Sequence, residues 1–261
     1  MARAVSTVLD VSVCLLLVGV AVTTLVFAVP GADERSDSER DTVAKSIGTV
    51  TASVPATDGR QTHDTLAGHL TAAAIVGASY DGERVGASTY PDAVRRTVRR
   101  DIPERTHITA RWRPYPEASL RGQLTVGPEP PSTADVSVNR WEIDSGLREP
   151  RSDRSFEAIA ASFATAYLRR LFPPERTRIA LVDARTAQRT AARYRAVAGT
   201  LGVDIEDELA DASSRRANER LADALTDRLE SDLRESYGSP AEAESDWTGN
   251  NVELVVRRWE A

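Results

Sequence analysis

A run of nineteen residues without a charged side chain, from Val11 to Val29, constrains this chain more than any other feature of its sequence. As a helix it would span roughly 28 Å, at about 1.5 Å per residue, which is close to the thickness of a bilayer core. Pro30 and Gly31 follow the run and would end the helix. We therefore predict one transmembrane helix at residues 11–29, with the lipid bilayer as a partner.

The charges around this run set the expected orientation. Arg3 and the amino terminus precede it, with Asp10 as the only acid, and an acidic stretch begins at Asp33. The positive-inside rule then predicts a single-pass protein of the cell membrane, with a cytoplasmic N-terminus and the bulk of the chain extracellular. Two readings of the run stay open: a simple signal anchor, and a secretory signal peptide cleaved after Ala28.

A third reading comes from the first residues of the chain. Arg3-Ala4-Val5-Ser6, followed by the long apolar run, resembles the processing site of archaeal type IV pilin-like proteins. In that family a dedicated peptidase cuts after the basic residue, so the resemblance implies a cut between Arg3 and Ala4. It covers only about the first 30 residues, and Asp10 departs from a wholly apolar start. Because structural pilins are usually smaller than this chain, it implies a minor or accessory subunit that assembles with other pilin-like subunits.

The composition narrows the class of protein further. The formal net charge is −6, and Lys45 is the only lysine among 33 basic residues. This balance resembles proteins of salt-loving archaea, where high salt screens exposed like charges; codon bias alone is the alternative. A net acidic chain argues against nucleic acid as a partner. The single cysteine, Cys14, lies in the apolar run, so no intrachain disulfide can form.

The order of composition along the chain predicts three segments. Residues 1–30 form the N-terminal segment with the transmembrane helix, residues 31–62 an acidic stalk or linker, and residues 63–261 an extracytoplasmic domain. The expected fold class is α+β: one N-terminal transmembrane helix, then a domain with an antiparallel sheet and several amphipathic helices.

The periodicity of apolar residues places the elements of that domain. Helical spacing predicts helices at residues 63–79, 91–100, 156–171, 182–201 and 204–237. We expect Pro173-Pro174 to stop the third of these helices, and Ser213-Ser214 can break the last. Alternation predicts strands at 106–112, 120–126, 134–143 and 251–259. We expect the first three strands to form an antiparallel meander. The last predicted strand resembles the first in its order of apolar residues, arginine and tryptophan, so we expect the two strands in the same sheet.

Motifs for catalysis or cofactor binding do not occur in the sequence. We find no glycine-rich phosphate loop, no nucleophile elbow and no zinc-protease helix motif. His63 and His69 are six residues apart, which on a helix would put them about 240° apart on different faces. We therefore predict no catalytic residue, no metal site and no cofactor, and a protein that is not an enzyme.

Two stretches of opposite charge are candidates for contacts with partners. Arg95, Arg96, Arg99 and Arg100 form two i,i+4 rows on one predicted helix, and residues 204–246 carry fourteen acidic residues and five arginines. We interpret the four arginines as a candidate interaction patch for an acidic subunit or surface polymer. A solvated helix face is the alternative interpretation for each stretch.

These observations together predict a non-catalytic, membrane-anchored, pilin-like accessory subunit of an archaeal pilus or secretion-type surface assembly. The alternative is an extracytoplasmic solute-binding or cell-envelope protein unrelated to pili.

Overall fold

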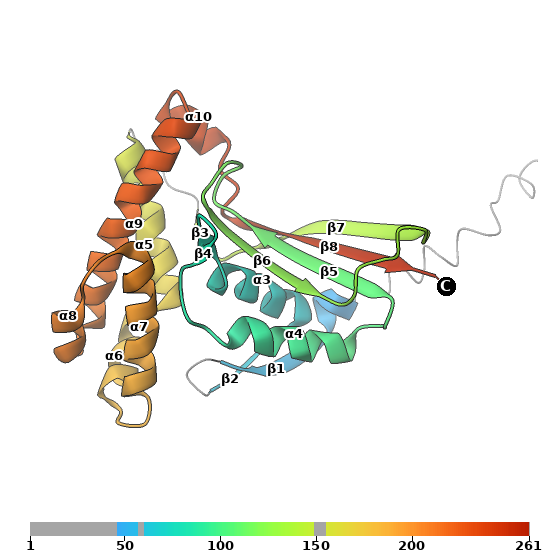
Figure 1. Ribbon diagram of the computed structural model, residues 1–261, viewed down its shortest axis with the longest axis horizontal. Helices are drawn as coiled ribbons and strands as arrows, with labels where there is room; N and C mark the ends of the chain where they lie inside the picture. Colours follow the sequence, from blue (N-terminus) through green and yellow to red (C-terminus); the bar gives the residue numbers. More distant parts are fainter. Residues whose placement is uncertain (1–45, 57–59, 149–154, 261) are drawn as a thin grey trace, which may run out of the picture. The chain divides into compact units, whose positions relative to one another are not determined.

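A computed structural model describes residues 46–56, 60–148 and 155–260 of the chain (Figure 1). These residues belong to one compact unit, Ala44–Ala261. Its strands are β1 Thr51–Pro55, β2 Gln61–Thr65, β3 Ser79–Tyr80, β4 Glu83–Arg84, β5 Thr106–Trp112, β6 Leu120–Val126, β7 Val136–Asp144 and β8 Asn251–Trp259. Its helices are α3 Leu66–Val76, α4 Tyr90–Asp101, α5 Phe156–Leu171, α6 Pro174–Val182, α7 Ala187–Leu201, α8 Glu206–Ala210, α9 Ser214–Ser236 and α10 Pro240–Ser245.

The predicted fold class needs a correction at its transmembrane helix. The α+β class with an antiparallel sheet is as expected, but no helix in the described ranges is long and apolar enough to cross a bilayer. Even α9, the longest of these helices at 23 residues, is charged along its length. The run at residues 11–29, on which the prediction rested, lies outside the described residues. The described residues therefore form an α+β fold.

The strands form a two-stranded hairpin, β1-β2, and a six-stranded antiparallel sheet in the order β4-β3-β6-β5-β8-β7. The C-terminal strand pairs with β5, Ile108 opposite Val256, so these two segments share a sheet as predicted. The predicted three-strand meander is wrong, because β8 lies between β5 and β7. It pairs with β7 from Asn251 opposite Asp144 to Trp259 opposite Val136.

Helix α3 covers one face of this sheet, and it lies unusually close to β6 (Figure 1). The burial of β6 alternates: Leu120, Gly122 and Leu124 are buried, while Arg121 and Gln123 are exposed. A Cβ atom at Gly122 would lie 2.1 Å from the backbone oxygen of Ala74 on α3. Only glycine on the strand therefore permits this contact.

A column of stacked aromatic rings joins the helices to the sheet. Trp112 of β5 stacks on Tyr167 of α5 at 5.7 Å between ring centroids, and Phe163 stacks on both rings. The polar ends of the rings are satisfied: Trp112 Nε1 donates to the Gly249 oxygen at 3.0 Å, and the Tyr167 hydroxyl donates to the Ile75 oxygen at 3.3 Å. We call Trp112, Phe163 and Tyr167 the aromatic column.

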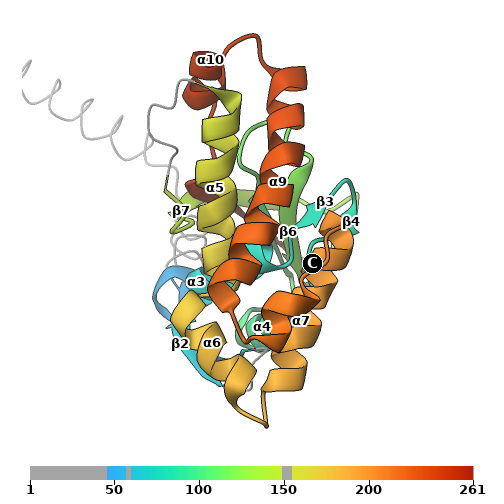
Figure 2. The same ribbon diagram turned by 90° about the vertical axis from the view of Figure 1, so that its left-hand side faces the viewer.

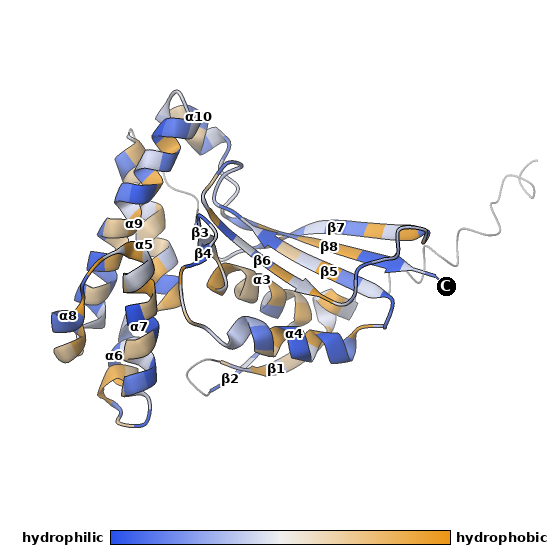
Figure 3. Ribbon diagram, in the orientation of Figure 1, coloured by the Kyte–Doolittle hydropathy of each residue, from blue (hydrophilic) through white to orange (hydrophobic). Residues whose placement is uncertain are grey.

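Helices α5 and α9 pack side by side against the end of the sheet (Figure 2). Helices α6, α7 and α8 extend this helical layer (Figure 1), and hydrophilic and hydrophobic residues both occur along the whole of α9 (Figure 3). The predicted break in the last long helix is confirmed. Helix α8 ends at Ala210, α9 begins at Ser214, and Ala212 between them takes the left-handed conformation at φ 49°.

Several helix boundaries differ from the prediction; the helix predicted at residues 182–201, for example, begins at Ala187. The helix predicted to begin at His63 begins at Leu66, because residues 61–65 pair with β1 and Thr65 caps the helix by accepting from Gly68 N at 3.0 Å. Helix α6 was missed, since we interpreted Pro173-Pro174 as a stop. Pro174 is instead the first residue of α6. At this position the backbone N–H has no partner within the helix, so proline loses no hydrogen bond there.

We expect Phe163→Ala to lower the free energy of unfolding by about 3–5 kcal/mol, because it leaves a cavity inside the aromatic column. Phe163 is 1% exposed. Urea unfolding of the full-length chain measures the change. The control is Val138→Ala, at an exposed position on β7, which we expect to change stability by less than about 0.5 kcal/mol. Equal effects of the two substitutions would show that the column does not support the fold.

Candidate functional site

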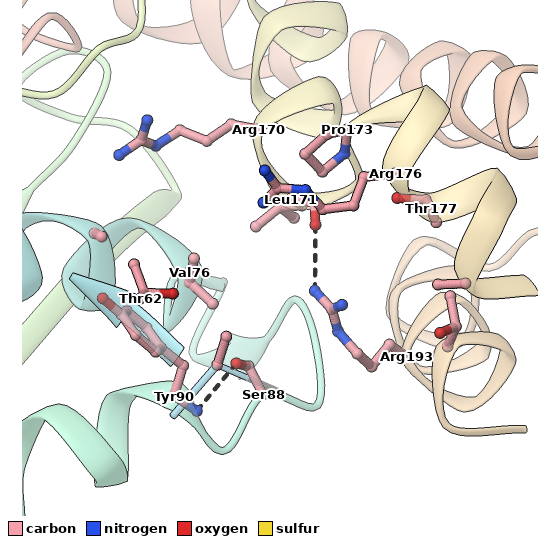
Figure 4. A pocket seen from close by; sticks show the side chains of 14 residues that line it. Thr62, Val76, Ser88, Tyr90, Arg170, Leu171, Pro173, Arg176, Thr177 and Arg193 are labelled. Carbon is pink, nitrogen blue, oxygen red and sulfur yellow. Dashed lines mark hydrogen bonds between the residues drawn. The ribbon is translucent and has the colours of Figure 1, made fainter. Parts of the chain in front are cut away.

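A pocket of about 310 Å³ lies between the first half of the described unit and helices α5, α6 and α7. We call it the arginine pocket, because Arg170, Arg176 and Arg193 line it together with Thr62, Ser88 and Tyr90. Figure 4 shows Thr62 and Tyr90 on one side of the pocket, with Thr177 and Arg193 opposite. No aspartate or glutamate is among the described residues that line it. Its volume is at the small end of the range for ligand sites.

Three consecutive helices supply the three arginines. Arg170 lies in the last turn of α5 and Arg176 in the first turn of α6, while Arg193 lies within α7. Only Phe172 and Pro173 separate α5 from α6, so arginines of the two helix ends line one cavity. The sequence thus concentrates positive charge through helix ends that meet at one place.

Arg193 is held in position by its neighbours. Its Nη2 donates to the Leu171 backbone oxygen at 3.2 Å, and its guanidinium lies 5.1 Å from the centroid of the Phe172 ring (Figure 4). Phe172 in turn stacks on Tyr194, with 3.9 Å between centroids. A cation over an aromatic face is stabilised by the ring quadrupole. Arg193 therefore forms a fixed wall of the pocket.

Arg170 is held in a less hydrated setting. Partial burial lowers the pKa of its guanidinium, and the negative potential of Tyr90, Asp144 and Asp64 acts in the opposite direction. A Cβ atom at Gly146 would lie 3.1 Å from Arg170 Nη1, so this glycine leaves the space that the guanidinium occupies. Arginine stays charged in such a site, because its unperturbed pKa is far above neutral.

Tyr90 closes the pocket wall through a buried hydrogen-bond chain. His69 Nε2 lies 3.0 Å from the Ala52 backbone oxygen, which can only accept, so Nε2 carries the proton. His69 Nδ1 then accepts from the Tyr90 hydroxyl at 2.7 Å. Burial raises the pKa of Tyr90 to about 12, with a further contribution from Asp64. The phenol is thus neutral and already committed to His69.

A second polar cluster surrounds Asp232 on α9. Its carboxylate accepts from the hydroxyls of Tyr80, Tyr115 and Ser119, and from the backbone N–H of Ser119 at 3.2 Å. Burial and the nearby carboxylate raise the pKa of Tyr80 and of Tyr115 above the usual range. A carboxylate with four donors is fully occupied, so we interpret this cluster as a joint between α9 and the sheet.

The sequence-predicted residues lie elsewhere. The four arginines of the predicted patch, Arg95, Arg96, Arg99 and Arg100, are exposed on α4, outside the arginine pocket. Arg95 pairs with Asp92, and Arg100 Nε donates to the Arg96 oxygen. His63 is exposed on β2 while His69 is buried on α3, and no group of three potential metal ligands occurs in the described ranges. Arg3 and Ala4 lie outside the described residues.

With this geometry established, comparison with known proteins places the chain in a family. The sequence model of a family of unknown function, DUF7284, matches residues 9–259. The chain belongs to this family. No curated protein and no solved structure matches it. The arginine pocket falls entirely within the matched residues.

Sequence reasoning missed the arginine pocket because its parts carry no motif. Arg170 lies near the end of the helix predicted at residues 156–171, and Arg176 follows the predicted stop at Pro173-Pro174. The available signal was a run of six arginines in residues 170–193, on both sides of Pro173-Pro174. Only three of the six line the pocket, and the sequence does not distinguish them from the other three.

We expect Tyr90→Phe to lower the free energy of unfolding by about 1–3 kcal/mol, because it leaves buried His69 Nδ1 without its donor. Chemical denaturation of the full-length chain measures this change. Tyr237→Phe is the matched control: the Tyr237 ring is only half-buried beside Tyr115, and we expect a change below about 0.5 kcal/mol. A Tyr90→Phe protein as stable as the control variant would contradict the assigned hydrogen-bond chain.

Proposed function

We propose that the chain is a non-catalytic solute-binding protein that holds a small organic anion in the arginine pocket. The observation that carries this proposal is that Arg170, Arg176 and Arg193 line one cavity with no acidic side chain in its described lining. Guanidinium groups bind carboxylates and phosphates through parallel N–H donors. This corresponds to the solute-binding alternative raised by the sequence.

The remaining walls support a ligand with an apolar part. Val76, Leu171 and Pro173 line the cavity between the polar groups. Ligand sites commonly combine such apolar walls with a few placed polar groups. The ligand class is therefore a carboxylate or phosphate attached to a small apolar group.

The state of the polar groups supports binding over catalysis. The Tyr90 hydroxyl donates to His69, and the Thr190 hydroxyl donates to the Thr186 oxygen at 2.9 Å. Both ring nitrogens of His69 are engaged behind Tyr90. A general base needs access to the proton that it abstracts, and a nucleophile needs such a base beside it. These groups instead serve as the fixed frame of the pocket.

Arg176 is the arginine best placed to contact a ligand. It is exposed, and none of the ion pairs between described residues includes it. Figure 4 shows its side chain entering the cavity from α6 above Arg193. Arg193 is already engaged by Leu171, and the guanidinium of Arg170 lies beside Gly146. We therefore assign Arg176 the primary contact with the anionic group.

The test compares benzoate with the uncharged benzamide as probes of the full-length chain, by calorimetry at low ionic strength. We expect benzoate to bind more tightly, and Arg176→Gln to weaken benzoate binding about tenfold or more, because it removes a hydrogen bond to a charged group.

The matched control is Arg178→Gln, on the same helix. Arg178 is exposed, pairs with Glu175 at 3.7 Å and does not line the pocket. We expect it to bind benzoate like the unmodified chain. Equal affinity for benzoate and benzamide, or equal loss in the two variants, would contradict an anion site at Arg176.

A second candidate function rests on the sequence Arg3-Ala4-Val5-Ser6, which favours a pilin-like accessory subunit of a surface assembly. Its prediction concerns the mature chain: mass spectrometry of the protein from its native cells should find Ala4 as the first residue. Arg3→Gln is the control and should leave the N-terminus uncut. A mature chain that starts near Val29 would exclude processing of the pilin kind.

A further inference from the structure

Two large aliphatic side chains project from α6 into solvent. Ile179 is 62% exposed and Val182 is 67% exposed, the highest values for large hydrophobic residues in the part of the chain that the structure describes. Their spacing of three residues puts them on one face of the helix. An exposed aliphatic pair costs hydration free energy, so a contact that covers it would be favourable.

A groove of about 510 Å³ lies beside this pair; Ile179 and four arginines line it. We call it the arginine groove; its cationic residues are Arg60, Arg176, Arg185 and Arg189. Asp183 is the one acidic residue in its described lining, and it pairs with Arg185 at 3.3 Å. No ion pair between described residues includes Arg189. The groove therefore carries excess positive charge beside exposed aliphatic groups.

These elements reach the solvent together. Figures 1 and 2 both show α6 and its turn into α7 at the end of the helical layer that points away from the sheet. Arg60 directly precedes β2, and Ile179 is among the residues that line the groove. Cations and aliphatic side chains are thus presented on one small surface.

The combination matches the chemistry of an anionic lipid interface. Two aliphatic side chains supply too little area for a stable protein interface, which buries about 800 Å² on each partner. A bilayer surface accepts single aliphatic side chains at its acyl boundary, while its phosphates attract arginine. The charge of the groove is complementary to such headgroups.

We propose that the α6–α7 tip docks on the phosphate headgroups of an anionic lipid bilayer, with Ile179 and Val182 entering the acyl boundary. Arg189, which lines the groove and not the arginine pocket, binds phosphate beside them. The arginine pocket and its ligand are not needed for this contact.

Hydrogen exchange of the full-length chain with preformed vesicles tests the proposal at the level of single segments. One set of vesicles contains phosphatidylglycerol and the other only phosphatidylcholine, so any other contact of the chain with lipid is present in both. We expect backbone amides of residues 174–190 to exchange more slowly with the anionic vesicles only. Equal exchange with both would overturn the proposal.

The variants separate the two parts of the contact. Arg189→Gln, which does not line the arginine pocket, should reduce the protection about fivefold, the factor expected for one arginine near an anionic surface. Ile179→Ser with Val182→Ser should abolish it, whereas Val138→Ser, at an exposed position on β7, should leave it unchanged. Protection that survives the double substitution would overturn insertion. Equal protection by inorganic phosphate without vesicles would overturn a lipid partner in favour of free phosphate.

Discussion

The stacking of Trp112 on Tyr167 and Phe163 is the contact on which the rest of the structure depends. It joins a strand at the middle of the sheet to the helix that begins the C-terminal layer, and the Tyr167 hydroxyl extends the connection to α3. Aromatics make up only 5% of the chain, so their concentration at one junction is significant. Buried ring pairs contribute more than area burial alone, because their geometry is specific.

This junction also determines where a ligand could lie. Tyr90 and Thr62 belong to elements before the junction, Arg170 lies on α5 itself, and Arg176 and Arg193 belong to the helices that follow α5. The cavity between them keeps its shape only if both halves are held together. The Asp232 cluster acts in the same sense at the other side, since one carboxylate of α9 binds groups from β3 and from the segment before β6. The pocket is therefore a property of the packing, and no single segment contains it.

The periodicity of apolar residues predicted most of the helices and strands. It did not predict the order of the strands in the sheet, or the helix that begins at the Pro173-Pro174 turn. The likeness of residues 108–112 to 254–259 correctly placed β8 in the sheet, because both are buried between neighbours. Its insertion beside β7 could not be predicted, since strand order depends on contacts far apart in sequence. The prediction missed helix α6 because Pro173-Pro174 was interpreted only as the end of a helix, whereas proline is also common at the first position of a helix. The arginine pocket was missed for that reason.

The two arginine-rich sites differ in how they would respond to salt. The Debye length falls from about 10 Å at 0.1 M to about 3 Å at 1 M, so long-range attraction disappears first. Arg189 in the arginine groove is exposed and acts on a surface at a distance. Arg170 is partly desolvated and Arg193 is fixed against Phe172, so the arginine pocket acts by direct contact. In a salt-rich environment, recognition in the pocket would persist, whereas docking through the groove would depend increasingly on Ile179 and Val182.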